Sequence, residues 1–300
     1  MNVFILLTQA FNGLSLFTIL LLMSLGLAVV FGLMGVINMA HGELMTLGAY
    51  STYLTARFFG QYLQAWMDYY LLVAIPLAFV VCFAAGYGLE RGFVRYFYKR
   101  PLDTLLATWG LSLILQQTYR SVFGAQEVSV PLAPWLAGAW QPVPGLDLPI
   151  NRIFIVGLTL VVALLVYLLF FRTRVGLRAR AVTQHRAMSS AVGINTGQVD
   201  ATIFALGAGL AGIAGSVFTM IGSTNPGTGQ AYVVDAFVVV VFGGVASLVG
   251  TVASSFTIAQ FQTVLEYVTS NTMAKVAVLA LVVFALYLRP SGLFSPKTRR

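Results

Sequence analysis

The stretch that decides the fold is GVINMAHGELMTLGAY, residues 35–50. Between two apolar segments it places an amide, an imidazole, a carboxylate and a hydroxyl, from Asn38, His41, Glu43 and Thr46. A carboxylate at bilayer depth costs at least about 2.5 kcal/mol, so Glu43 should face a water-filled path, a partner or the interface. Irregular backbone in a membrane is tolerated only inside protein or along a cavity, which favours a broken or re-entrant element that lines or gates a path. The alternative is a cytoplasmic turn in which Glu43 merely caps the next helix, although lining the path and capping are compatible roles.

The composition around this stretch is that of an integral membrane protein. The 300 residues are 59% hydrophobic and 9% charged, whereas soluble domains carry about 25% charged residues. The stretch from Met1 to Leu22 has no basic lead and no small-residue cleavage site, so we expect it to stay in the mature chain as a membrane segment. No soluble domain is visible, and we predict one transmembrane domain over residues 1–300.

Several apolar runs approach the roughly 20 residues that cross the hydrocarbon as a helix. They predict an all-α polytopic bundle of about eight or nine transmembrane segments. Two glycine-interrupted stretches, Phe31 to Gly48 and Phe242 to Gly250, resemble each other and predict an inverted repeat with broken or re-entrant helices. The glycines of the second stretch leave open whether residues 233–250 and 252–268 are two separate spans or one broken segment. The cores are 12–34, 43–60, 69–89, 104–124, 151–171, 199–221, 233–250, 252–268 and 273–289.

Three segments hold most of the 17 basic residues, and short cytoplasmic loops are where such residues gather. An even number of spans can separate these segments, so all three fit the cytoplasmic side. We therefore expect a cytoplasmic carboxyl terminus and an external amino terminus. The three segments contain Arg91, Arg95, Lys99 and Arg100; Arg172, Arg174, Arg178, Arg180 and Arg186; and Arg289, Lys297, Arg299 and Arg300.

Two polar-leaning stretches connect the spans. Residues 125–150 are rich in proline and include Trp135 and Trp140, which predicts an external loop that is either a partial cap or a connector. Residues 172–198 combine a basic lead, a short amphipathic helix and a glycine stop. The apolar positions Ala187, Met188, Ala191 and Val192 favour a docking face for a partner over a merely solvated loop.

Further polar residues lie in or near the later spans, and each is individually more typical of contacts between helices than of a transport path. Among them, Gln116, Asp235 and Gln260 are our candidates for the path. Small residues at Gly207, Ala211 and Gly215 predict close helix packing.

The sequence also argues against several chemistries. His41 and Glu43 supply only two candidate metal ligands, and Cys82, the single cysteine, allows no intramolecular disulfide. No lysine follows a glycine, so there is no Walker A motif, and we expect no cofactor on this chain. The basic residues flank spans and form no stripe with aromatic residues, which argues against nucleic acid. An intramembrane enzyme built on His41 and Glu43 would lack a nucleophile.

Five stretches of the sequence form a recognisable set. They are VINMAHGE (36–43), ATWGLS (107–112), residues 172–195, VVFGGV (240–245) and RPSGLF (289–294). At these stretches the sequence resembles the permeases of branched-chain amino-acid ABC importers, and most closely their urea-uptake branch. The resemblance covers nearly the whole chain. One departure is Ser189-Ser190-Ala191 before the coupling glycine, where general ABC permeases often have Glu-Ala-Ala.

The resemblance implies the partners and the solute. It implies a bacterial inner-membrane permease that pairs with a second, homologous permease chain, two cytoplasmic ATPases that bind ATP and Mg²⁺, and an external solute-binding protein. Urea is the expected solute, with a branched-chain amino acid as the alternative. A self-sufficient channel or ion-coupled carrier using Glu43 and Asp235 is the alternative from another class. The implied coupling helix that docks on an ATPase includes Thr183, Arg186, Ala187, Ala191, Val192 and Gly193.

Overall fold

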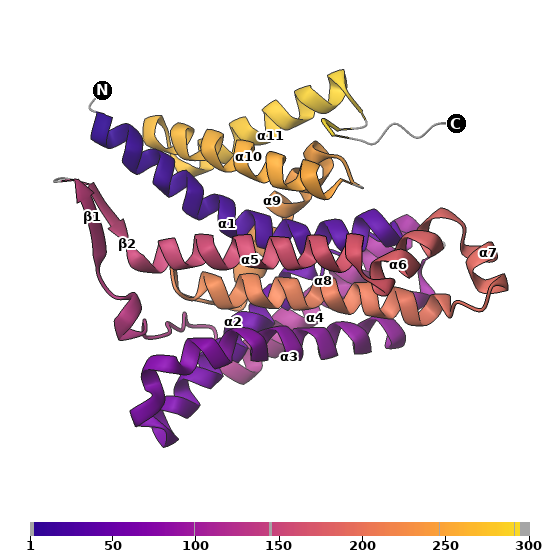
Figure 1. Cartoon of the computed structure of the whole chain (residues 1–300), viewed down its shortest axis with the longest axis horizontal. Coiled ribbons are helices and arrows are strands. Elements are labelled where there is room, and N and C mark those ends of the chain that lie inside the picture. Colours follow the sequence, from indigo (N-terminus) through magenta and orange to yellow (C-terminus); the bar gives the residue numbers. More distant parts are fainter. Residues whose placement is uncertain (1–2, 99, 144–145, 246, 291, 295–300) are drawn as a thin grey trace.

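The computed structural model describes residues 3–98, 100–143, 146–245, 247–290 and 292–294, and Figure 1 shows that helices dominate it. The α-helices are α1 (Val3–Met34), α2 (His41–Tyr62), α3 (Tyr70–Gly92), α4 (Pro101–Phe123), α5 (Ile150–Arg172), α6 (Arg174–Gln184), α7 (Arg186–Ala191), α8 (Thr196–Phe218), α9 (Thr228–Gly243), α10 (Leu248–Val268) and α11 (Asn271–Leu288). Three 3₁₀ helices (Gln64–Tyr69, Val94–Tyr96 and Pro134–Leu136) and one antiparallel hairpin, β1 (Ala139–Val143) with β2 (Leu146–Pro149), complete the described elements.

The predicted all-α membrane bundle is confirmed. Each of the nine apolar cores matches one helix, and six described helices (α1, α3, α5, α8, α10 and α11) are long and apolar enough to cross a membrane. The seventh and eighth cores are separate helices, α9 and α10. Gly244 makes the turn between them with φ +99°, and the Ser247 side chain caps α10 by accepting from the Gly250 amide.

The bundle has two distinct ends (Figure 1). The β1–β2 hairpin and the start of α1 lie at one, which we call the hairpin end, and α6 and α7 lie at the other, the α7 end. All three basic segments reach the α7 end in the described residues: Arg95 and Arg186 line one cavity there, and Arg289 ends α11 at the same end. The predicted common side for the basic segments is therefore consistent with the fold. Lys99, Lys297, Arg299 and Arg300 lie outside the described residues.

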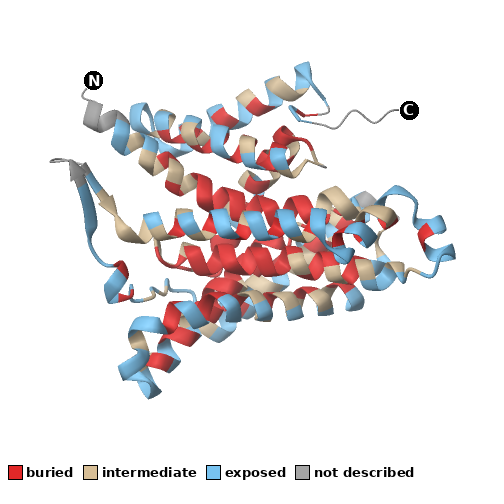
Figure 2. Ribbon diagram, in the orientation of Figure 1, coloured by how far each residue is buried: buried red, intermediate tan, exposed pale blue. Residues whose placement is uncertain are grey.

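Helix α8 forms the centre of the core, as the buried ribbon in Figure 2 shows. Its glycines allow neighbouring backbones to approach: Gly207 faces α1 at Gly26, Gly212 faces α3 at Ala78, and Gly215 faces α2 at Met45. The prediction of close packing at residues 207–215 is thus confirmed, and the missing side chains are the physical reason.

Two helices begin deep inside the bundle. After α1 ends at Met34, the chain turns at Gly35 (φ +67°) and runs back, so that His41, at the start of α2, contacts Met23 and Gly26 in the middle of α1. The stretch that begins with Gly35 is therefore re-entrant and buried rather than a cytoplasmic turn. Glu43 does lie in the first turn of α2, as the alternative expected. Its backbone irregularity is accommodated because the residues around it are buried protein.

The second interruption follows α8. Residues 219–227 return into the bundle from the hairpin end, and the amide of Gly229 in the first turn of α9 donates to Thr46 Oγ1 in α2 at 3.0 Å. Helices α2 and α9 then run to opposite ends, α2 toward the hairpin end and α9 toward the α7 end. A second helix start inside the bundle is therefore present at α9, and the predicted second interruption at Phe242 to Gly250 is wrong. Gly243 and Gly250, which flank the connection from α9 to α10, contact each other instead. The inverted repeat itself stays a prediction.

The predicted external loop is a structured cap at the hairpin end. The Tyr70 hydroxyl donates to the Pro131 carbonyl at 2.6 Å, and the Trp135 indole donates to the Asp68 carbonyl at 2.6 Å. Val128 and Thr224 exchange two backbone hydrogen bonds, which tie the loop to the returning segment after α8. These hydrogen bonds hold the loop against neighbouring segments, so the structure favours the partial cap over a simple connector.

Candidate functional site

The site is built where α2 and α9 begin. Gly42 and Gly229 bring the backbones of the two first turns into contact, and Thr46 Oγ1 joins them by accepting from the Gly229 amide. Asn38 orders the segment before α2, because its Oδ1 accepts from the Ala40 amide at 3.1 Å. A helix start carries a partial positive charge, so this junction concentrates two such ends within the core. The amides of Glu43 and Gly229 already donate within the protein, to the Ala40 carbonyl and to Thr46 Oγ1.

Glu43 lies at this junction with no exposed surface. Its Oε1 accepts from Ser112 Oγ at 3.0 Å and from Gln116 Nε2 at 2.8 Å, both on α4. Gln116 Nε2 also donates to Gln230 Oε1 of α9 at 2.8 Å, and the Tyr119 hydroxyl donates to the Glu43 carbonyl at 3.0 Å. We call Glu43, Ser112, Gln116, Tyr119 and Gln230 the junction cluster. It links three helices, because Gln116 of α4 donates both to the Glu43 carboxylate of α2 and to Gln230 of α9.

Three buried polar atoms near the junction have no hydrogen-bond partner in the described residues. They are the second carboxylate oxygen of Glu43, Nδ1 of His41 and Nδ2 of Asn38. His41 is otherwise held by the contact of Nε2 with the Met23 carbonyl at 3.3 Å. An unsatisfied buried polar group costs about 1–3 kcal/mol, so a polar solute or water that supplies partners here would be stabilised.

The predicted coupling segment forms two short helices at the α7 end. Gly193 ends α7 with φ +87°, and the Ile194 amide donates to the Ser189 carbonyl, as in a glycine-stopped helix. Arg186 forms an ion pair with Asp200 at the start of α8, at 2.5 Å. Ala187, Ala191 and Val192 are exposed, as is Met188 beside them. The tip of the segment therefore presents apolar side chains to its surroundings.

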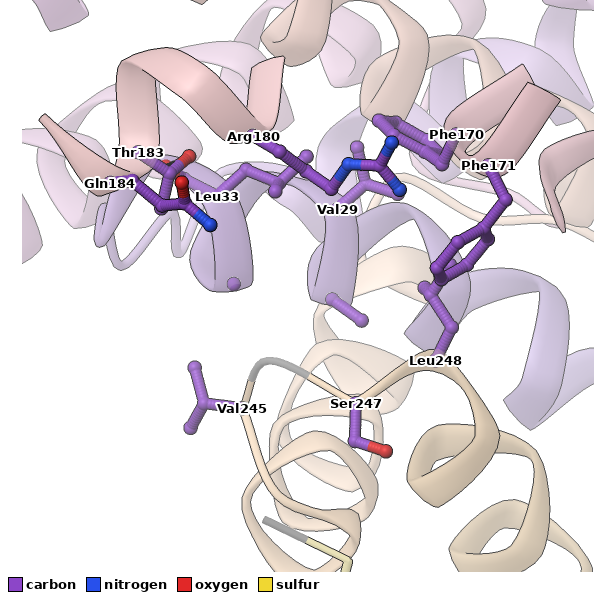
Figure 3. A pocket seen from close by; sticks show the side chains of 12 residues that line it. Val29, Leu33, Phe170, Phe171, Arg180, Thr183, Gln184, Val245, Ser247 and Leu248 are labelled. Carbon is purple, nitrogen blue, oxygen red and sulfur yellow. Dashed lines mark hydrogen bonds between the residues drawn. The ribbon is translucent and has the colours of Figure 1, made fainter. Parts of the chain in front are cut away.

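Thr183 connects this segment to the core. Its hydroxyl donates to the Leu33 carbonyl in the last turn of α1 at 2.7 Å, two residues before the re-entrant segment begins at Gly35. Figure 3 shows the cavity of about 320 Å³ beside it, where Arg180 and Gln184 of α6 face Val245 and Ser247 of the α9–α10 turn across an open space. The coupling segment is therefore hydrogen-bonded to the end of α1 and lines the same cavity as the α9–α10 connection.

Comparisons with known proteins agree with this architecture. Residues 9–286 match the family described as branched-chain amino acid transport system / permease component. The chain belongs to this family. No solved structure matches the chain. The permease is therefore a transport component, and an enzymatic role for His41 and Glu43 has no support.

Curated relatives match the permease over almost its full length. It is 28% identical to the high-affinity branched-chain amino acid transport system permease protein BraD of Pseudomonas aeruginosa, over 96% of this chain and 95% of that protein. It is 28% identical to LivH of Escherichia coli K12, over 96% and 94%. It is 24% identical to the probable branched-chain amino acid transport permease protein LivH of Methanocaldococcus jannaschii, over 92% and 88%.

The structure brings together five of the seven residues predicted for the path. Asn38, His41, Glu43, Thr46 and Gln116 all lie at the junction of α2 and α9. Two lie elsewhere in the permease. Asp235 accepts from Lys275 Nζ of α11 at 3.0 Å, and Gln260 of α10 donates to the Ala10 carbonyl of α1 at 3.2 Å. Both make contacts between helices, which is the role that single polar residues in spans usually have.

Sequence reasoning missed Ser112, Tyr119 and the role of Gln230. Ser112 and Gln116 are four residues apart, so they share one face of α4, and Thr108 extends that face to the Met39 amide at 3.1 Å. This spacing was a usable signal for a polar stripe on α4. Gln230 gave no such signal, because its partner lies 114 residues earlier in the sequence.

Proposed function

We propose that this permease carries a branched-chain amino acid along a path that passes the junction cluster. The observation that carries the proposal is the meeting of two helix N-termini around Glu43 in the buried core. Interrupted helices that begin at mid-depth are a general way to expose backbone N–H groups to a solute inside a membrane protein. Glu43, Gln116 and Gln230 add a carboxylate and two amides at the same place.

The choice of solute rests on the relatives. Those compared are permeases of branched-chain amino acid transport systems, and none is a urea permease. This favours the alternative that the sequence analysis placed second, and urea, placed first there, has no support beyond the earlier resemblance.

The proposed assembly contains partners that this chain does not provide. We infer that the α7 end is cytoplasmic, because the basic segments gather there, and that the hairpin end faces an external solute-binding protein. Exposed apolar residues of α7 would dock on one of two ATPases, which bind ATP and Mg²⁺. A second permease chain, homologous but different, would complete the path in the bacterial inner membrane.

A channel or an ion-coupled carrier is the second candidate. Glu43 is the observation that favours it, because a buried carboxylate with an unpartnered oxygen is a feature of proton and cation pathways. Asp235 supports it less, because its charge is already balanced by Lys275.

Reconstitution in liposomes tests the proposal. The permease, its partner chain, the ATPases and the binding protein are expected to take up labelled leucine only with internal ATP, and excess unlabelled isoleucine, but not urea, should compete. Uptake by the permease alone without ATP would instead establish the carrier or channel. Competition by urea but not by isoleucine would reassign the solute.

A further inference from the structure

A second cavity lies at the hairpin end, away from the junction cluster. It has a volume of about 590 Å³, which lies within the range of ligand pockets. Residues from α1, α5, α9 and α10 line it, together with Ile221 of the segment after α8. Tyr232 of α9 lines the cavity and lies two residues after Gln230 of the junction cluster in the sequence.

Two opposite charges line this cavity without neutralising each other. Arg152, in the first turn of α5, donates from Nη1 to Asn12 Oδ1 of α1 at 2.5 Å. Glu266, near the end of α10, accepts from Gln262 Nε2 at 2.8 Å. Among the described residues, neither side chain forms an ion pair. Each charged side chain is therefore hydrogen-bonded to a neutral amide side chain and not to an opposite charge.

Other charged residues of the bundle do form ion pairs. Asp235 is paired with Lys275, and Asp200 with Arg186. These pairs satisfy structural needs without a ligand. Arg152 and Glu266 differ from these pairs, because they lie at helix ends, are partly exposed and have no counter-charge among the described residues. The guanidinium of Arg152 has five donors, of which one is used in the described structure, so four remain for a ligand.

We propose that this cavity is a binding site for a zwitterionic α-amino acid. Arg152 would bind the carboxylate, a group for which the planar guanidinium is suited, and Glu266 would bind the ammonium. Leu16, Ile19 and Ile221 of the same cavity offer apolar surface to an aliphatic side chain. The proposal rests on the proposed function and adds to it a first receiving site on the side from which solute would arrive.

Equilibrium binding to the assembled transporter in nanodiscs, without the binding protein, tests this site. The probes are leucine, 3-methylbutylamine, which lacks the carboxylate, and 4-methylpentanoate, which lacks the ammonium. Arg152→Gln should weaken leucine binding by about tenfold or more, the effect of one charged hydrogen bond, and leave amine binding unchanged. Glu266→Gln should weaken leucine similarly and leave 4-methylpentanoate unchanged.

Two charge-removing controls lie at the same end and outside the cavity. Arg120→Gln, at the end of α4, and Asp147→Asn, in β2, should bind leucine as the wild type does.

Absence of saturable leucine binding to the wild type, or equal losses for all three probes in a variant, would overturn the site. Leucine uptake by the same complete assembly with ATP distinguishes failure of this site from failure of the proposed function. If leucine is taken up but both variants bind it as the wild type does, the site is rejected and the proposed function stands. If leucine is not taken up, the proposed function is rejected.

Discussion

Gly42 and Gly229 touch backbone to backbone, and this contact joins the first turns of two helices that run to opposite ends of the bundle. A Cβ on either glycine would lie against the carbonyl of the other. Backbone cannot move aside as a flexible side chain can. The contact therefore fixes how closely α2 and α9 approach, and with it the geometry of the junction cluster.

Gly229→Ala is expected to destabilise the permease. Overpacking of this kind costs about 1–3 kcal/mol, and the Thr46 hydrogen bond to the Gly229 amide would be strained as well. Thermal unfolding in detergent should show a lower midpoint. Gly157→Ala in α5 is the matched control, because a Cβ there meets nothing within 4 Å. Equal midpoints for the two variants would contradict the assigned contact.

Gln116→Ala tests the junction cluster in transport. The change removes the amide that donates to both Glu43 and Gln230, and it leaves a buried carboxylate with Ser112 as its remaining side-chain donor. Initial leucine uptake by the complete transporter should fall about tenfold, the effect of one hydrogen bond to a charged group. Gln117→Ala alters the neighbouring exposed residue of α4 and should transport normally. A normal rate in Gln116→Ala would remove the cluster from the path.

Val192→Asp tests the docking face of the coupling segment. Val192 is 70% exposed and Met188 is 61% exposed, so the folded permease has no need of either in its own core. An aspartate buried without a partner at an apolar interface should weaken ATPase binding by about tenfold or more. Pull-down of the ATPase by the purified permease measures this. Trp140→Asp at the hairpin end is the control, and unaltered ATPase binding by Val192→Asp would reject the face.

The pH dependence of Glu127 tests the link between the hairpin-end loop and the returning segment. Hydrogen bonds from Ser223 and then Asn225 lower the pKa of the Glu127 carboxyl below its ordinary value. A lowered folded pKa means that the stabilisation is present above the unfolded pKa and is lost as the pH falls through the folded one. The Val128 and Thr224 amides should therefore lose protection from hydrogen exchange in acid, after correction for the intrinsic exchange rate.

The Glu127→Gln variant supplies the comparison. It should show lower protection at neutral pH and little change across the acid range, since it has no carboxyl to titrate. Protection in the wild type that is independent of pH would mean that the Glu127 contacts do not hold the loop.

Much of the fold could be predicted from residue order alone. Apolar runs of sufficient length can only be helices in a bilayer, since every backbone group must find a partner within its own segment. This is why the nine cores matched nine helices. The polar residues of 35–50 also identified the re-entrant element, because Glu43 had no reason to lie beside hydrocarbon.

The sequence did not predict which helices contact one another. Gly243, Gly244 and Gly250 predict the second interruption at the wrong place, because nothing in the local sequence distinguishes a glycine that makes a turn from one that admits a neighbouring backbone. Likewise Asp235 and Gln260 had the residue types of a path, but Lys275 and the α1 backbone were their partners. Such partners are chosen by packing over long sequence separations.

The sequence by itself determined that this protein is a helical membrane bundle with a polar interruption at residues 35–50 and a basic segment at 172–198, because hydropathy and charge act locally. The tertiary structure alone decided what meets that interruption. It brought Gly229, Gln230 and the polar face of α4 to Glu43, because only Gly42 and Gly229 lack the side chains that would keep the two helix starts apart.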